Sequence, residues 1–106
     1  MIKAEALNEL GQSGPALTIL NDLRARNFAT PETISATGQD AVRAAILRER
    51  LFEFAGEGKR RQDLIRHGRF TEPRQFKEQR EPYRILFPIP ATQVQTNPLL
   101  TQNAGY

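Results

Sequence analysis

The chain has 106 residues, a quarter of them charged, with a net charge of +3 and no cysteine. The length fits one small domain, and the lack of cysteine excludes disulfides, thiolate nucleophiles and zinc sites built on cysteine. No stretch approaches the roughly 20 apolar residues of a membrane-spanning helix. Nucleic-acid binding is disfavoured, because Glu57 and Asp63 interrupt the basic residues at helical spacing and leave no stripe of one sign.

Residues 1–27 are expected to form a helical hairpin. The first helix covers residues 2–10 and ends at Gly11, and the second begins near Ser13 as its N-cap. Pro15 then lies in the first turn, where its missing N–H has no cost. The short connection predicts two antiparallel helices of the tetratricopeptide sort. A single hairpin covers one side only, so its other apolar face is expected to be exposed.

Residues 28–39 are expected to form a linker, and residues 40–68 a third, kinked helix with Asp40 as its cap. The apolar residues of this segment share a broad helical face. Gly56 and Gly58 lie in its interior, where each costs about 1 kcal/mol relative to alanine. We therefore predict a kink at these glycines.

The carboxylates around the kink are expected to form structural ion pairs. Glu49, Glu53 and Glu57 are four residues apart and share one helix face. A helical di-metal site would add histidines at i+3 and ligands from four helices, whereas the chain has a single histidine, which is explained as a helix-end residue. We predict a partly buried network of Glu57, Arg60 and Asp63. No catalytic, metal-ligating or cofactor-binding residue is predicted, and an enzyme is not expected.

The last 22 residues, 85–106, contain no charged side chain and are called the uncharged tail. They follow a polar loop, residues 71–84, in which one helical turn is expected. Three prolines exclude a continuous helix or a central strand in the tail. Its apolar side chains predict an extended strip that packs on the helices, with Phe87, Ile89 and Leu99 more than three-quarters buried.

Two stretches carry motifs whose order and spacing resemble the carboxy-terminal end of the SusD/RagB family, the outer-membrane nutrient-binding lipoproteins of Bacteroidetes. The first motif comprises Glu49, Arg50, Glu53, Glu57, Gly58, Arg60 and Asp63. The second comprises Pro88, Pro90, Asn97, Pro98, Asn103, Gly105 and Tyr106. The chain departs from the family at Arg61, where an aromatic residue is usual. It also lacks the apolar leader and lipidated cysteine of the family, so we expect the last piece of such a protein.

The resemblance implies an all-α fold and a binding function without a cofactor. The expected role is the C-terminal scaffold part of a surface-exposed glycan- or nutrient-binding protein that serves a TonB-dependent, SusC-like outer-membrane transporter. Its ligand would be an oligosaccharide or a peptide. The glycan-contacting residues of the family lie outside these motifs, so none is assigned. The alternative is a free-standing tetratricopeptide-like module that binds a protein or peptide.

Overall fold

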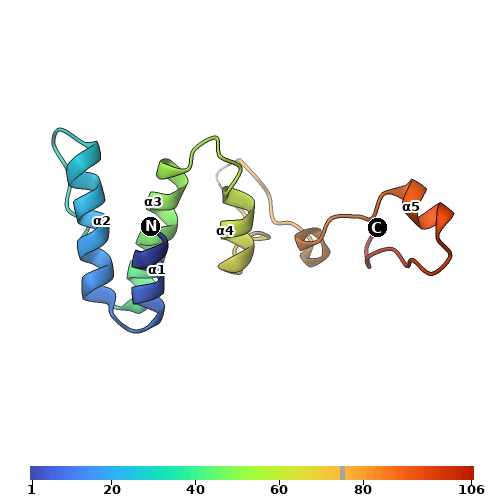
Figure 1. Ribbon diagram of the computed structural model, residues 1–106, viewed down its shortest axis with the longest axis horizontal. Helices are drawn as coiled ribbons and strands as arrows, with labels where there is room; N and C mark the ends of the chain where they lie inside the picture. Colours follow the sequence, from blue (N-terminus) through green and yellow to red (C-terminus); the bar gives the residue numbers. More distant parts are fainter. Residues whose placement is uncertain (75) are drawn as a thin grey trace. The chain divides into compact units, whose positions relative to one another are not determined.

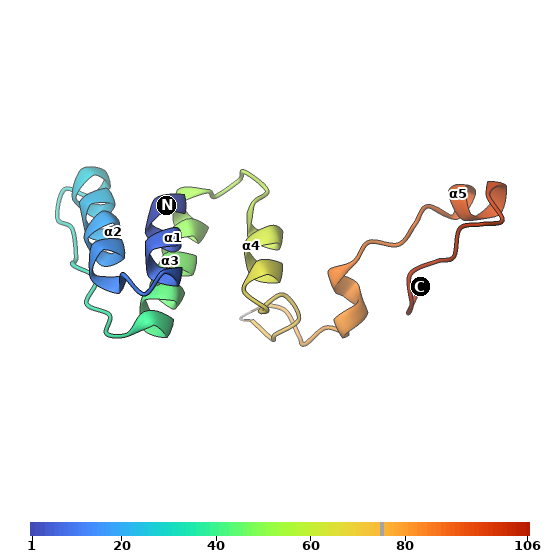
Figure 2. The same ribbon diagram turned by 60° about the horizontal axis from the view of Figure 1, so that its bottom comes forward.

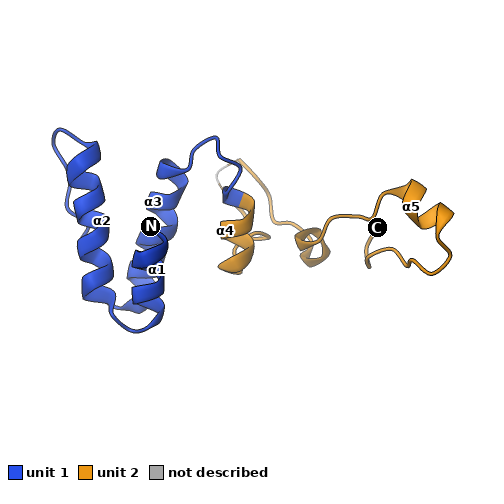
Figure 3. Cartoon of the chain, viewed as in Figure 1, with its two compact units in different colours: residues 1–60 blue, residues 61–106 orange. Residues whose placement is uncertain are grey.

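The computed structural model describes residues 1–74 and 76–106 (Figure 1). Apart from one isolated β-bridge between Arg74 and Lys77, its regular elements are helical, which confirms the all-α prediction. The chain divides into two compact units, residues 1–60 and residues 61–106 (Figure 3). The tetratricopeptide-like detail stays a prediction.

The first unit contains α1 (Ile2–Glu9), α2 (Ser13–Asn27) and α3 (Gln39–Glu53). Helices α1 and α2 form the predicted antiparallel hairpin, and α3 packs against both helices while running in the direction of α2 (Figure 2). The buried core at their junction consists of Ala4, Ala16, Leu20, Val42 and Ile46. Alanines at this position let the helix backbones approach closely, and the larger aliphatic side chains fill the remaining space.

The linker between α2 and α3 returns along α2 and is fixed by one side chain. Asn21 accepts a hydrogen bond from the backbone N–H of Ile34 at 2.8 Å and donates to the Ile34 carbonyl at 3.2 Å. Both backbone groups of Ile34 are thereby satisfied, as an ordered non-helical segment requires.

Two predicted helix starts are wrong in their capping residue. Gln12, not Ser13, occupies the N-cap of α2, and the Ser13 hydroxyl instead donates to Asn8 Oδ1 at 2.8 Å. Helix α3 begins at Gln39 after Gly38, so Asp40 is already helical and pairs with Arg43. Both residues therefore lie inside the helix, beyond the N-cap position from which a side chain bonds the first N–H groups.

The third predicted helix is broken rather than kinked. Helix α3 ends at Glu53, and residues 54–59 lie outside any helix. Gly56 and Gly58 have φ of 83° and 69°, a left-handed backbone that a right-handed helix cannot include. Helix α4 (Arg60–Arg66) follows, and the predicted stop at Gly68 is correct, with φ of 68°.

The second unit adds η1 (Pro82–Ile85) and α5 (Ala91–Thr96), the latter a helix that the sequence did not predict. The expected burial of the uncharged tail is wrong for two residues, because Phe87 is 68% exposed and Leu99 is 91% exposed. Ile89 is partly buried. Within this unit α4 and α5 have only seven and six residues, too few to offer a broad apolar face to the tail.

Candidate functional site

Helix α3 carries the first three residues of the first motif, and all three contact the hairpin formed by α1 and α2. The Glu49 carboxylate is buried and accepts from Arg24 Nη1 at 3.0 Å, which links α3 to α2. Arg50, also buried, lies 4.0 Å from the Glu5 carboxylate of α1. Glu53 accepts an exposed hydrogen bond from Asn27 at 3.1 Å. These contacts join helices, and none of the three motif residues opens onto a common cleft.

The residues after α3 do not all share the predicted burial. Asp63 is buried and accepts from Arg66 Nη2 at 3.0 Å. Arg60 is partly buried and donates from Nη1 to the Leu47 carbonyl at 3.0 Å. Glu57 is exposed in the turn. The burial predicted for the network therefore holds for Arg60 and Asp63 and fails for Glu57.

A hollow of about 530 Å³ lies at the end of α3, lined chiefly by Arg50, Phe54, Arg60 and the turn glycines. The Arg50 guanidinium lies 4.9 Å from the centre of the Phe54 ring, within cation–π range. A smaller hollow of about 240 Å³ is lined by Arg24, Arg48 and Glu49 together with Ile34 and two alanines. Arginine side chains line both hollows, and neither set of lining residues pairs a nucleophile with a base.

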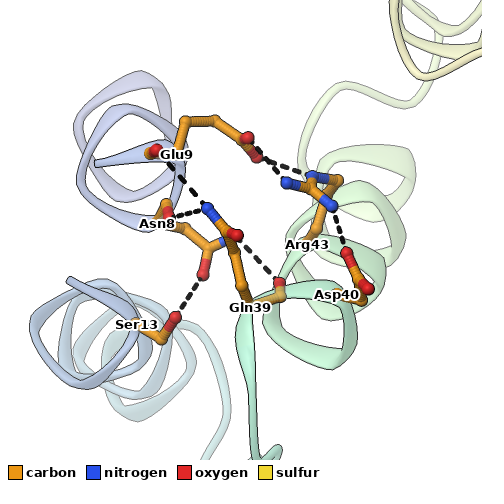
Figure 4. A network of polar contacts seen from close by, with 6 residues as sticks. All are labelled: Asn8, Glu9, Ser13, Gln39, Asp40 and Arg43. Atoms are coloured by element: carbon orange, nitrogen blue, oxygen red, sulfur yellow. Dashed lines mark hydrogen bonds and ion pairs between the residues drawn. The ribbon is translucent and has the colours of Figure 1, made fainter. Parts of the chain in front are cut away.

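A polar network joins the end of α1 to the start of α3 (Figure 4). Asn8 is fully buried, donates to the Gln39 carbonyl at 3.0 Å and accepts from Ser13 at 2.8 Å. The Gln39 side chain donates back to the Asn8 carbonyl at 2.8 Å. The sequence analysis missed this network, because Asn8 and Gln39 are 31 residues apart and no local pattern pairs them.

Arg43 extends the network with a two-pronged ion pair to Glu9, both distances 2.7 Å (Figure 4). The hydrogen bonding of Arg43 to the Glu9 carboxylate is the main cause that raises the pKa of Arg43 above its ordinary value, and the Asp40 carboxylate adds to it. Arginine is charged in proteins in any case, so this ion pair depends on the ionisation of Glu9.

The second motif closes the uncharged tail on itself. Asn103 donates to the Phe87 carbonyl at 2.7 Å, and the Tyr106 hydroxyl donates to the Leu86 carbonyl at 2.9 Å. Gly105 has φ of 94°, and a Cβ at this position would lie 2.5 Å from the Tyr83 ring. Only glycine fits this combination of backbone and contact.

The other tail residues of the motif bound α5. Pro90 is its N-cap, and Asn97 is its C-cap and accepts the Leu99 N–H at 3.0 Å. Pro98 follows directly, where a helix cannot continue. Pro88 is exposed in the segment before α5.

Arg61, the departure from the family pattern, has a defined position in the second unit. Its guanidinium lies 5.0 Å from the centre of the Phe70 ring and 4.0 Å from that of Phe87. It also donates to the Ile85 carbonyl at 2.7 Å. Through these contacts, two of them within cation–π range, Arg61 ties the start of the uncharged tail to α4.

Across residues 1–74 and 76–106, no three acidic or histidine side chains converge in a way that could hold a metal ion. No helix within the same residues is long and apolar enough to cross a membrane.

Comparison with known proteins gives a consistent result. Residues 1–75 match the model of the SusD family. The whole chain aligns at 38% identity with SusD-like protein P25 and at 33% with SusD-like protein P38, both of Formosa agariphila. It aligns over its whole length at 30% identity with starch-binding protein SusD of Bacteroides thetaiotaomicron. The chain spans 23%, 22% and 20% of the length of these three relatives. No solved structure gives a significant match.

Proposed function

This chain belongs to the SusD family, and from that premise we propose that it forms the C-terminal scaffold part of a glycan- or nutrient-binding protein. The observation that carries the proposal is the 30% identity, over the whole chain, to a protein named for binding starch. By the same membership we propose a place at the outer-membrane surface and a TonB-dependent, SusC-like transporter as partner. The protein would capture oligosaccharide or peptide and pass it on without chemistry.

The contacts of the motif residues support a scaffold role rather than a sugar site. A sugar site needs polar groups with spare hydrogen-bonding capacity around an apolar or aromatic floor. Here Glu49 binds Arg24 across two helices, and Asn103 and Tyr106 bind backbone carbonyls of their own tail. These polar groups are engaged in holding the chain in shape.

A hybrid protein tests the proposal. Residues 1–106 would replace the matching stretch of starch-binding protein SusD, and starch binding would be measured by affinity electrophoresis. We expect the folded hybrid to bind starch within about tenfold of the parent, or about 1.4 kcal/mol in binding free energy, and the 106-residue chain alone to show no retardation. The hybrid with Glu57→Ala, at an exposed position, should behave like the unmodified hybrid. A folded hybrid without starch binding would contradict the proposal, and retardation of the chain alone would place a sugar site within it.

A second candidate is a tetratricopeptide-like module that binds a protein or peptide. It is favoured by Ile2 and Leu10, which are 78% and 75% exposed on the hairpin and could contact an apolar partner. The module hypothesis predicts that the chain alone is monomeric and selects a peptide from a display library. The scaffold hypothesis predicts that no peptide is selected above background.

A further inference from the structure

The uncharged tail satisfies its own backbone through polar side chains. Gln102 accepts from the Ile89 N–H and donates to the Ile89 carbonyl, both at 2.8 Å. Asn103 and Tyr106 hold the carbonyls of Phe87 and Leu86. These bonds hold the tail in a defined conformation, although its large apolar residues stay exposed.

Those apolar side chains instead point outwards. The exposed large apolar residues of the tail are Ile85, Leu86, Phe87, Leu99, Leu100 and Tyr106. The segment itself has no charged side chain, so covering its own side chains would remove no charge of the tail from water. Exposed apolar groups gathered in one charge-free segment are typical of an interaction surface.

Further contacts give this surface a fixed shape. The Tyr106 ring meets Tyr83 edge-on, with ring centres 5.0 Å apart, and Gly105 lies against Tyr83. The Arg61 guanidinium contacts the Phe87 ring and donates a hydrogen bond to the Ile85 carbonyl. A surface that is ordered before docking loses little conformational freedom when it binds.

The relatives indicate what covers it. All three align with the whole chain, tail included, yet the chain spans only 20–23% of their length. In such proteins the tail and the remaining polypeptide are covalently joined, which gives two docking surfaces an effective concentration on the order of millimolar. We propose that the apolar side of the uncharged tail docks on the polypeptide outside the matched region, as an intramolecular interface of a SusD-length protein. This proposal rests on the proposed function.

Thiol labelling tests it, because the chain contains no cysteine. Leu99→Cys would be introduced into the 106-residue chain and into a hybrid in which residues 1–106 replace the matching region of SusD-like protein P25. Maleimide labelling of the tail peptide, followed by mass spectrometry, should be at least tenfold slower in the hybrid. The matched control is Glu78→Cys, at an exposed position of the polar loop, which should label at the same rate in both proteins.

Two outcomes would overturn the proposal. Equal labelling of Leu99→Cys in both proteins would show that the tail stays uncovered. Slow labelling in the 106-residue chain that speeds up on dilution would assign the surface to a second copy of this chain. Should the hybrid not fold, the same measurement on SusD-like protein P25 itself, with cysteine at the position aligned with Leu99, decides the question. The labelling involves no sugar, so its result is independent of the starch-binding test.

Discussion

Single buried polar side chains fix how the helices of residues 1–60 meet. The apolar core would tolerate small shifts of one helix along another, because hydrophobic contact has little directionality. The bonds of Asn8 to Ser13 and Gln39, and of Glu49 to Arg24, each require one relative position of two helices. Asn8 and Glu49 are both buried, where an unmatched polar group is costly.

We predict that Asn8→Ala lowers the free energy of unfolding by about 1–3 kcal/mol. The substitution leaves the Gln39 carbonyl without its Asn8 donor, and a buried unsatisfied group costs about that much. Urea denaturation followed by circular dichroism at 222 nm measures it, since the three long helices dominate that signal. Thr18→Ala is the control, because its bond to the Gly14 carbonyl is exposed, and it should stay within about 0.5 kcal/mol. Equal effects of the two substitutions would contradict the prediction.

Arg24→Ala should destabilise the same helices by about 3 kcal/mol. It leaves the Glu49 carboxylate, whose side chain is 8% exposed, without its guanidinium partner in a buried position. Arg26→Ala on the exposed side of α2 is the matched control and should change little. The double substitution Arg24→Met, Glu49→Leu should recover most of the loss, because it removes both charges from the interior. If Arg24→Ala left the urea midpoint unchanged, water would be solvating the Glu49 carboxylate and the ion pair would contribute no stability.

At the scale of elements, the turn between α3 and α4 depends on glycine backbones rather than on side-chain contacts. An added Cβ at Gly56 or Gly58 would meet nothing within 4 Å, yet both have positive φ. The cost of substitution there is therefore conformational, about 1–2 kcal/mol for most residues and less for asparagine.

Gly58→Ala and Gly58→Asn should therefore lower the melting temperature to different extents. Alanine should lower the melting temperature by several degrees, because 1 kcal/mol shifts a domain of this size by about 4–8 °C. Asparagine should lower it by less than half as much. If both substitutions left the melting temperature unchanged, the turn would tolerate a right-handed backbone and α3 could extend through it.

Local chemistry explains which elements were predictable. Gly11 and Gly68 end helices as expected, and the apolar face of α3 places Val42 and Ile46 in the core. Such signals depend on neighbours within one or two turns. For the site, the pattern predicted ion pairing for Glu49, but not that Arg24, 25 residues away, would be the partner.

The failures have physical causes of their own. A single glycine lowers helix propensity by about 1 kcal/mol, which does not distinguish a kink from a break. The break here comes from two glycines, Gly56 and Gly58, that both have a left-handed backbone. Hydropathy predicts that Phe87 and Leu99 are buried, but it does not identify the surface that would cover them. Both side chains are exposed, and the amide groups of Gln102 and Asn103 bond the backbone of the tail, a role that composition alone does not reveal.

Gln102→Ala should loosen the uncharged tail without affecting α1–α3. It removes both side-chain bonds to Ile89, so the Ile89 amide should exchange at least tenfold faster with solvent deuterium. Gln95→Ala, at an exposed position of α5, should leave that exchange rate unchanged. If the Ile89 amide stayed protected from exchange in Gln102→Ala, apolar packing would order the tail rather than the two Gln102 hydrogen bonds.

The whole molecule presents apolar side chains on both of its units. Ile2 and Leu10 are exposed on the hairpin, and Phe87 and Leu99 on the uncharged tail. Monomeric soluble proteins rarely expose contiguous apolar patches above a few hundred Å². If the tetratricopeptide-like prediction for the hairpin is right, a neighbouring repeat would cover its exposed apolar side chains.

We therefore expect the 106-residue chain alone to self-associate and to bind neither glycan nor nucleic acid with useful affinity. Light scattering across a concentration series should show a rising mass, because apolar burial between copies is favourable at about 25 cal/mol per Å². Ile2→Glu with Leu10→Glu should shift that rise to higher concentration, whereas Gln95→Glu should not. A glycan array run on the same samples gives the second readout, since self-association and sugar binding draw on different groups. A monomer at every concentration that binds one specific sugar would overturn both expectations and place a ligand site within this chain.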